Sequence, residues 1–264
     1  MQYFIVADVH SFYNEMIKSL EENGWENRDD QCFVSLGDLC DRGPDTVKCL
    51  QFVNALPDNR KILIRGNHED LMELAICRHI FYAHDIHNGT VKSAEHIATH
   101  EGVAIKEHGL SEEDDMEILE AVKNSELWNN YIKSTVNFSE VGNNIFVHGW
   151  IPCERVIKED SMGFLKTVEY KKKDKWRSDA STWSEARWIN GMEAWSLGAK
   201  IRGKTIWCGH WHTSWGHAHL HHEGVEFPKN GEKAHFSPFV DKGIVAMDAC
   251  TAFSNKVNCK VLEV

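Results

Sequence analysis

The sequence predicts an α/β fold built on short buried strands, and three observations support this prediction. Short apolar runs recur along the 264 residues, and each of them ends in a polar cluster. Segments with the spacing of amphipathic helices separate the early runs, which is the order of elements found in parallel sheets. A long, mostly helical stretch then interrupts the pattern after the third run. The apolar content of 42% and the charged content of 26% are those of an ordinary globular protein.

Five apolar runs rich in Val, Ile and Phe are predicted to be buried strands. The runs are Tyr3 to Ala7 before Asp8, Cys32 to Leu36 before Gly37, Lys61 to Arg65 before Gly66, Asn144 to Val147 before His148, and Thr205 to Cys208 before Gly209. Because ligands of such sheets bind at the carboxyl ends of the strands, we expect the five polar clusters to share one site. Ile244 to Met247 and Val257 to Val264 are further predicted strands, and we expect them to complete a second sheet.

The segments between the first three runs carry the signals of helices. Phe12 to Leu20 is predicted to be helical, and Gly24 is expected to end that helix. Thr46 to Leu56 follows Pro44-Asp45, a typical opening for a helix. The chain therefore begins with the order strand, helix, strand, helix, strand.

A helical insertion is predicted after the third strand, within one domain that spans residues 1–264. We place this insertion at about residues 70–135, where apolar residues recur at helical spacing. It separates the third polar cluster from the fourth. We expect it to border the site and to influence the choice of substrate.

The charge balance and the apolar runs exclude several kinds of partner. A formal net charge of -11 argues against a protein that coats nucleic acid, because phosphate backbones are bound by broad Lys/Arg surfaces. No stretch approaches the roughly 20 apolar residues of a membrane span. Met1 to Ile5 lacks the basic region of a signal peptide. We therefore expect a cytoplasmic protein with no membrane or nucleic-acid partner, and the sequence does not indicate an oligomeric state.

The cluster from Gly37 to Gly43 is the most specific of the five. Asp38 follows a predicted strand and has two oxygens that can bridge two cations, while Arg42 offers a planar fork to phosphate oxygens. A charged turn with an internal ion pair is the alternative, but it leaves the other clusters unexplained. Asp8 and His10 add a carboxylate and an imidazole able to bind one divalent metal, although a simple turn would use the same residues.

The remaining clusters supply an amide and four imidazoles. Asn67 can bind a hard cation or cap a helix, and His68 is a candidate proton donor because its pKa can be tuned near neutrality. His148, His210 and His212 lie at two further strand ends. A lone buried histidine is more often a core residue than a ligand. The convergence of five clusters on one sheet edge favours ligands here.

These motifs resemble the calcineurin-like metallophosphoesterases, and within them the phosphoprotein phosphatase branch, which includes bacterial and phage serine/threonine phosphatases and symmetrical diadenosine tetraphosphatases. The resemblance implies a two-sheet β-sandwich flanked by helices, in the order α-β-β-α, with a helical insertion. The residues that carry the resemblance are Asp8-Val9-His10, Gly37 to Gly43, Arg65 to Glu69, His148-Gly149 and Gly209-His210.

The resemblance also implies a role for each residue of the motifs. The implied metal ligands are Asp8, His10 and Asp38 for a first ion, and Asp38, Asn67, His148 and His210 for a second. His212 would add a ligand to the first ion. His68 would be the catalytic histidine, oriented by Asp41. Arg42 would hold the substrate phosphate, with Asn67 beside it in the substrate site.

Three features depart from the pattern of this branch or extend it. Trp150 stands where many of these phosphatases have a second glycine, and it is expected to narrow the mouth of the pocket. His212 is typical of the wider superfamily, which weakens the assignment to protein phosphatases. Arg187 is the candidate for a second phosphate-binding arginine, although a surface ion pair or a stacked arginine is an equal alternative. The histidines that follow are interpreted as an exposed loop rather than a metal site: His217, His219, His221 and His222.

The function predicted from these residues is hydrolysis of phosphate esters or anhydrides by a hydroxide held between two ions roughly 3.5–4 Å apart. A serine/threonine-phosphatase-like phosphomonoesterase is our first choice, and a dinucleoside polyphosphate (diadenosine tetraphosphate) hydrolase is the alternative. The substrate is therefore a phosphoprotein, a nucleotide or a small phosphoester. Manganese is the first choice of metal, with iron and zinc left open. A non-catalytic metal-binding scaffold is disfavoured, because the set of ligands is complete.

Overall fold

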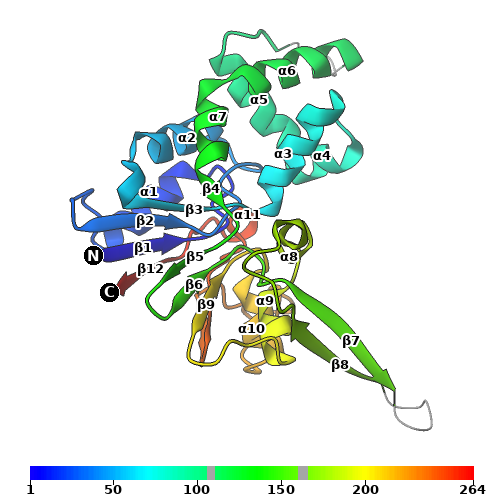
Figure 1. The fold of residues 1–264 in the computed structure, drawn as a ribbon. Coiled ribbons are helices and arrows are strands. Elements are labelled where there is room, and N and C mark those ends of the chain that lie inside the picture. The colour runs from blue at the N-terminus through cyan, green and yellow to red at the C-terminus, as the bar shows by residue number, and fades with distance from the viewer. Residues whose placement is uncertain (106–110, 160–165) are drawn as a thin grey trace.

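The computed structural model describes residues 1–105, 111–159 and 166–264. Two five-stranded sheets lie against each other, with helices on their outer faces (Figure 1). A two-stranded hairpin projects away from this body. The arrangement is the α-β-β-α sandwich that the sequence predicted.

The first sheet has the strand order β12-β1-β2-β3-β4. Its strands are β1 (Gln2–Val6), β2 (Gln31–Ser35), β3 (Lys61–Ile64), β4 (Thr135–Val136) and β12 (Cys259–Glu263). β1 to β4 run parallel, so their carboxyl ends lie along the same edge of the sheet. Antiparallel β12 pairs with β1, placing Gln2 opposite Glu263. The prediction that Val257 to Val264 completes the second sheet is therefore wrong, since this segment closes the edge of the first sheet.

The second sheet has the strand order β10-β11-β9-β6-β5. Its strands are β5 (Ser139–Val141), β6 (Asn144–Phe146), β9 (Thr205–Cys208), β10 (Phe239–Asp241) and β11 (Ile244–Ala246). The three central strands β6, β9 and β11 run parallel, and the two edge strands are antiparallel to their neighbours. The projecting hairpin pairs β7 (Cys153–Glu159) with β8 (Lys166–Lys172).

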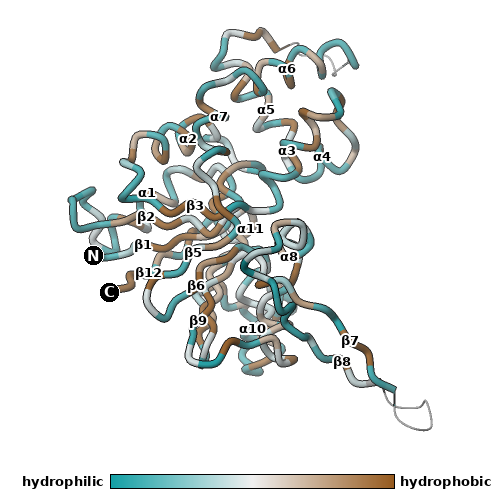
Figure 2. Tube along the Cα trace, in the orientation of Figure 1, coloured by the Kyte–Doolittle hydropathy of each residue, from teal (hydrophilic) through white to brown (hydrophobic). Residues whose placement is uncertain are grey.

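Alternation along the strands divides the core into three layers. In β1, Phe4 and Val6 pack under the helices of the first sheet, whereas Ile5 faces the second sheet. The layer between the sheets contains Ile5, Val34, Ile64, Phe146, Trp207 and Val245. The third layer covers the outer face of the second sheet and includes Trp150, Trp183 and Trp195. Figure 2 shows the strands of both sheets as apolar segments, as burial on two faces requires.

The helices over the first sheet begin where the sequence predicted them. α1 starts one residue after Phe12 and ends before Gly24, whose φ is +90°. The helices before β3 are α1 (Tyr13–Glu22) and α2 (Thr46–Ala55). Among the described residues, five helices separate β3 from β4, and they lie together beside the first sheet in Figure 1. They are α3 (Asn67–Arg78), α4 (Ala83–Asn88), α5 (Thr90–His100), α6 (Glu112–Asn124) and α7 (Glu126–Ser134). The predicted insertion also includes residues 106–110, which lie outside the described residues.

Short helices accompany the second sheet. They are α8 (Trp183–Ala186), α9 (Gly191–Ser196), α10 (Thr213–His219) and α11 (Thr251–Ser254), together with the 3-10 turn Ala180–Thr182. A further 3-10 turn, Asp58–Arg60, directly precedes β3 in the first sheet. Within the described ranges, the helices are all too short or too polar to cross a membrane.

Candidate metal centre

The ends of β1, β2, β3, β6 and β9 bring the predicted polar residues together. The ligand atoms of His10, Asp38 and His68 lie within 4.8 Å of one another. Those of Asp38, His148 and His210 form a second group within the same distance, so the two groups share Asp38. Parallel strand order explains the convergence, because each of these side chains follows the carboxyl end of a strand.

The loops that carry the site are tightly wound. Their residues adopt positive φ angles, which non-glycine residues rarely do and which cost about 1–2 kcal/mol each. These residues are Asp8, His10, Ser11, Asp38, Asp41, Arg42 and His210. Such a concentration of left-handed backbone at the strand ends marks a functional site, where strain is retained to aim side chains inward.

Asp38 is the centre of the cluster. Its Oδ2 lies 3.9 Å from Nε2 of His10 and 3.8 Å from Nε2 of His68, while its Oδ1 lies 3.3 Å from Nε2 of His148. Burial acts to raise the pKa of Asp38, but the nearby His148 and His68 together lower the pKa well below its usual value. A fully buried carboxylate that faces imidazoles on both oxygens has the geometry of a bridge between two cations.

Asn67 and His148 show why this cluster calls for a cation. Nδ1 of His148 donates to the carbonyl oxygen of Leu36 at 2.8 Å, so Nε2 of the neutral ring carries a lone pair. That lone pair faces Oδ1 of Asn67 at 2.7 Å and Oδ1 of Asp38 at 3.3 Å. Three acceptors that point at one another in a buried site repel unless a positive charge lies between them, either a proton on Nε2 or a metal ion. Burial lowers the pKa of His148, but Asp38 raises it overall, which favours the proton when no metal is bound. The donor set of imidazole, amide and carboxylate therefore fits a divalent metal.

His210 and Asp8 complete this side of the centre. Nδ1 of His210 lies 2.8 Å from Oδ1 of Asn67, and burial lowers the pKa of His210 to about 3. An imidazole held neutral in this way keeps a free lone pair for a metal. Both carboxylate oxygens of Asp8 accept from the backbone N–H of His210, at 2.9 and 3.0 Å. This contact ties the end of β1 to the end of β9, and so joins the two sheets at the site.

His68 is oriented by a buried acidic partner. Its Nδ1 donates to Oδ2 of Asp41 at 2.7 Å, and the hydroxyl of Thr90 donates to the same oxygen at 2.7 Å. Ser93 accepts from the backbone N–H of Asp41, so helix α5 holds the acidic partner in place. Burial lowers the pKa of His68, but Asp38 and Asp41 outweigh it and the pKa is raised overall. His68 is thus positioned to carry a proton.

Arg42 lies at the exposed mouth of the cluster. Its two terminal nitrogens approach Nε2 of His10 at 2.9 Å and Nε2 of His68 at 3.1 Å. The guanidinium is exposed, whereas both histidines are buried. A planar cation in this position can bind phosphate oxygens with two N–H groups while the reacting atoms sit deeper.

Glu69 is a residue of the site whose role the sequence did not reveal. Its Oε2 accepts from the backbone N–H groups of Asp38 and Gly66 at 3.1 and 2.7 Å, and its Oε1 accepts from Leu39 at 3.0 Å and from the Tyr131 hydroxyl at 2.8 Å. A Cβ atom at Gly66 would collide with the side chain of Asp38, which explains the glycine. Glu69 therefore joins the loops after β2 and β3, and these hydrogen bonds fix the position of the Asp38 backbone.

Replacing Glu69 by glutamine tests this joining role. The amide NH2 of the variant would face backbone N–H donors, so at least one buried donor loses its acceptor. We expect a loss of about 1–3 kcal/mol in the free energy of unfolding. Tyr131→Phe is the matched control, because it removes one donor and leaves the three backbone contacts. Its expected loss is about 0.5–1.5 kcal/mol. Denaturant unfolding that gives equal losses for both variants would contradict the role of Glu69.

Asp248 is a second residue that the sequence analysis passed over. It follows β11 and is buried, and burial raises its pKa to about 6. The pKa of Asp8 is raised, first by burial and then by the nearby charge of Asp248. The signal was available, because Asp248 follows the apolar run Ile244 to Met247 just as the other site residues follow theirs.

His212 lies apart from the two groups of ligand atoms. Its Nδ1 lies 3.0 Å from the Ser214 hydroxyl, and its Nε2 lies 3.3 Å from Oε1 of Glu226. Oε2 of Glu226 in turn lies 3.0 Å from Nε2 of His219. A carboxylate thus holds the imidazole of His212, and the role of His212 as a metal ligand stays a prediction.

Arg187 and Trp150 are both buried. Arg187 donates to Oδ2 of Asp70 at 2.6 Å and to the backbone oxygen of Arg65 at 3.2 Å, and it also contacts Asn137. The ion pair joins a buried arginine to a half-buried aspartate, and phosphate binding by Arg187 stays a prediction. The indole of Trp150 is fully buried and donates to the carbonyl oxygen of Ala199 at 2.9 Å. The expectation that Trp150 narrows the pocket mouth is therefore wrong, because its ring fills the core behind the second sheet.

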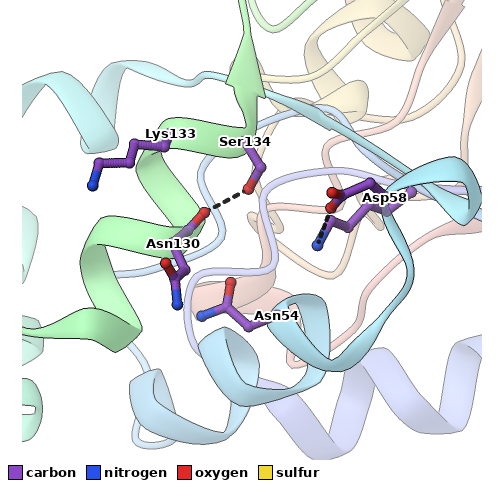
Figure 3. A pocket seen from close by; sticks show the side chains of 6 residues that line it. Asn54, Asp58, Asn130, Lys133 and Ser134 are labelled. Atoms are coloured by element: carbon purple, nitrogen blue, oxygen red, sulfur yellow. Dashed lines mark hydrogen bonds and ion pairs between the residues drawn. The ribbon is translucent and has the colours of Figure 1, made fainter.

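Cavity volume does not locate this site. A cavity of about 570 Å³ lies between the end of α2 and α7. Figure 3 shows polar side chains at its wall, with the Ser134 hydroxyl donating to Asn130 and an ion pair between Asp58 and Lys61. None of the predicted site residues lines it. The cavity offers no convergent set of ligands, so the chemistry belongs to the strand ends.

The chain belongs to the calcineurin-like phosphoesterase family, whose sequence model matches residues 1–214. This range contains all of the predicted metal ligands. The fold agrees with this membership. A mutant of a cold-active protein tyrosine phosphatase aligns over 99% of this chain and 75% of its own chain, with a TM-score of 0.51 and 13% sequence identity. At that identity the likeness concerns the fold alone.

Curated relatives match only part of this chain. A symmetrical bis(5'-nucleosyl)-tetraphosphatase of Psychromonas ingrahamii is 42% identical over 76 residues, which are 29% of this chain and 26% of that protein. Serine/threonine-protein phosphatase 1 of Salmonella typhimurium is 37% identical over 68 residues, which are 26% of this chain and 30% of that protein. The matched segments thus span less than a third of either relative.

Proposed function

We propose that this chain is a phosphoesterase that uses two divalent metal ions. The observation that carries the proposal is that Asp38 belongs to two groups of closely spaced ligand atoms, one containing His10 and the other His148 and His210. Asp8 and His10 would hold one ion and Asn67, His148 and His210 the other. When bound, the two ions supply Lewis acidity that activates a water molecule and offsets the negative charge on phosphate. Manganese is our first choice, with iron and zinc as alternatives, and the cytoplasmic location predicted from the sequence is part of the proposal.

The chain's own residues supply the positioning and the proton. Arg42, exposed at the mouth, binds two oxygens of the substrate phosphate and orients it for in-line displacement. Once Arg42 turns from Nε2 of His68 to the substrate phosphate, this nitrogen is free to carry a proton and donate it to the departing oxygen, since Nδ1 is held by Asp41. Asp41 is a positioning residue, since it supports the protonated form of His68 without reaching the mouth.

The substrate that we propose is a phosphomonoester such as a phosphorylated serine or threonine side chain. The exposed position of Arg42 supports this, because a protruding side chain can present its phosphate at an open mouth. A dinucleoside polyphosphate is the second candidate, favoured by the similarity to the symmetrical tetraphosphatase. Measuring the rates of hydrolysis of a phosphoserine peptide and of diadenosine tetraphosphate under the same conditions decides between the two candidates. A chain that cleaves neither of these substrates nor p-nitrophenyl phosphate, while it retains metal, would be the non-catalytic scaffold.

Metal removal tests the proposed centre directly. The chelated protein is expected to hydrolyse p-nitrophenyl phosphate no faster than buffer does, because the bound ions are proposed to activate the attacking water. Readdition of Mn²⁺ should restore turnover, and near two ions per chain should be found by elemental analysis. Full turnover in protein shown to be free of metal would overturn the proposal.

A further inference from the structure

A second cluster of ligand types lies at the end of α10, outside the proposed centre. The ligand atoms of His217, His221 and Glu223 lie within 4.8 Å of one another. His217 is buried, its neighbour His221 is half-buried and Glu223 is exposed. The expectation that these histidines form an exposed loop is therefore wrong for His217, which lies on a helix and packs its ring 5.6 Å from that of Phe239.

The hydrogen bonds of His217 leave one ring nitrogen aimed at an acceptor. Nε2 lies 3.1 Å from the backbone oxygen of Ser237, which can only accept, so Nε2 carries the hydrogen. Nδ1 of the neutral ring then carries a lone pair, and it faces Oε2 of Glu223 at 3.4 Å. A protonated His217 would form an ion pair with Glu223 here, whereas a neutral ring places two acceptors face to face. A metal cation between the neutral ring and the carboxylate satisfies both, and a backbone carbonyl behind the ring is the usual outer partner of a metal-bound histidine.

Backbone contacts hold the residues of this cluster in position. The N–H of Glu223 donates to the carbonyl oxygen of His217 at 2.8 Å, which folds the carboxylate back over the helix end. Gly224 has a φ of +69°, and a Cβ atom there would collide with the backbone oxygen of Lys233. This close approach brings the ring of His235 to 5.8 Å from that of His217. The turn therefore requires glycine at position 224. It places His235 beside the group formed by His217, His221 and Glu223.

His221 has an outer partner of the same kind. Its Nε2 lies 3.3 Å from Oδ2 of Asp241, a carboxylate that can orient the imidazole. Its ring also packs against Phe239 at 4.5 Å. Both imidazoles of the group are thus held from behind by acceptors. This arrangement limits the rings to orientations that keep the three ligand atoms together.

We propose that His217, His221 and Glu223 bind a divalent ion of the zinc type, separate from the phosphoesterase centre. Two imidazoles and one carboxylate are a common ligand set for Zn²⁺, and His235 or water completes the coordination. The ion would join the end of α10 to the turn at Gly224. Since Glu226 lies three residues beyond Glu223 and holds His212, the ion would also steady the wall beside the predicted first metal.

The test measures bound zinc in three proteins after Zn²⁺ loading and dialysis. Glu223→Gln keeps the size of an exposed side chain and removes the charged ligand, and we expect it to hold one ion fewer per chain than wild type. His222→Asn is the matched control, since its backbone has a φ of +58° that asparagine tolerates and its ring lies outside the group. It should hold as many ions as wild type. Equal zinc content in Glu223→Gln and wild type would overturn the proposal.

A second readout separates this site from the phosphoesterase centre. The visible absorption spectrum of Co²⁺-loaded Glu223→Gln is expected to lack one component of the wild-type spectrum. The same component should persist in the spectrum of Co²⁺-loaded Asp38→Asn. A spectrum that loses no component in Glu223→Gln but loses its components in Asp38→Asn would refute the zinc-type site and leave the proposed function standing. A spectrum that loses a component in Glu223→Gln and none in Asp38→Asn would refute the two-metal proposal alone. Thermal unfolding in chelator, with equal midpoints for Glu223→Gln and wild type, confirms that the substitution leaves the fold intact.

Discussion

The variant Asp38→Asn is expected to lose both bound metal ions and its hydrolytic activity together. Asp38 is the residue common to the two ligand groups, and its two oxygens face imidazoles on opposite sides. An amide supplies one neutral oxygen where the carboxylate supplied two charged ones. Loss of an outer partner typically lowers metal affinity about 10–100-fold, and loss of the bridge should exceed this range.

Asp8→Asn is the matched control for this experiment, because it makes the same chemical change at a ligand of one ion only. Elemental analysis should find close to one ion in Asp8→Asn and close to none in Asp38→Asn. The isosteric amide of Asp38→Asn can still accept from the backbone N–H of His68, so the loop should stay folded. Near two ions per chain in Asp38→Asn would contradict the bridging role.

The variant His68→Asn is expected to lose activity in proportion to the difficulty of the leaving group. A serine alkoxide departs reluctantly and needs a proton, whereas nitrophenolate is stabilised by its ring. General acid catalysis contributes about 10²–10⁴-fold, so we expect a loss of this size on a phosphoserine ester and a much smaller loss on p-nitrophenyl phosphate. Both metal ions should remain bound, since asparagine replaces a residue proposed to carry a proton.

Asp41→Asn provides the graded comparison. Its side chain holds Nδ1 of His68 at 2.7 Å, so its replacement should give the same bias toward good leaving groups with a smaller loss. Single-turnover measurements ensure that the chemical step is compared for each ester. Equal losses on both esters in His68→Asn, or loss of an ion from it, would remove His68 from the acid role.

The fold and the centre could be predicted largely because both follow from strand ends. A polar residue that follows a buried strand in a parallel sheet is placed at one edge by topology, whatever the loops do. This rule brought Asp38, Asn67 and His148 together, and it would have included Asp248 had it been applied to the last run. The fold class was confirmed, while the residue roles and the single domain stay predictions.

The residues whose roles could not be predicted interact with partners that are distant in sequence. Glu69 accepts from Tyr131, 62 positions away, so no local pattern announces its role. Trp150 adjoins a predicted ligand, yet its ring turns into the core because Ala199 offers an acceptor there. His217 is buried by contacts with Ser237 and Phe239. These contacts cannot be predicted from the sequence of the helix that carries His217.

The pairing of β1 with β12 has a consequence for synthesis on the ribosome. Gln2 and Glu263 are hydrogen-bonded although 261 positions separate them. Strand β1 is synthesised before β12, and one of its edges has no partner until β12 has left the exit tunnel. Long-range pairing of this kind slows folding, and an open edge invites association with other chains. The nascent chain is therefore expected to depend on holding chaperones during translation, even though its predicted metal ligands are complete by residue 212.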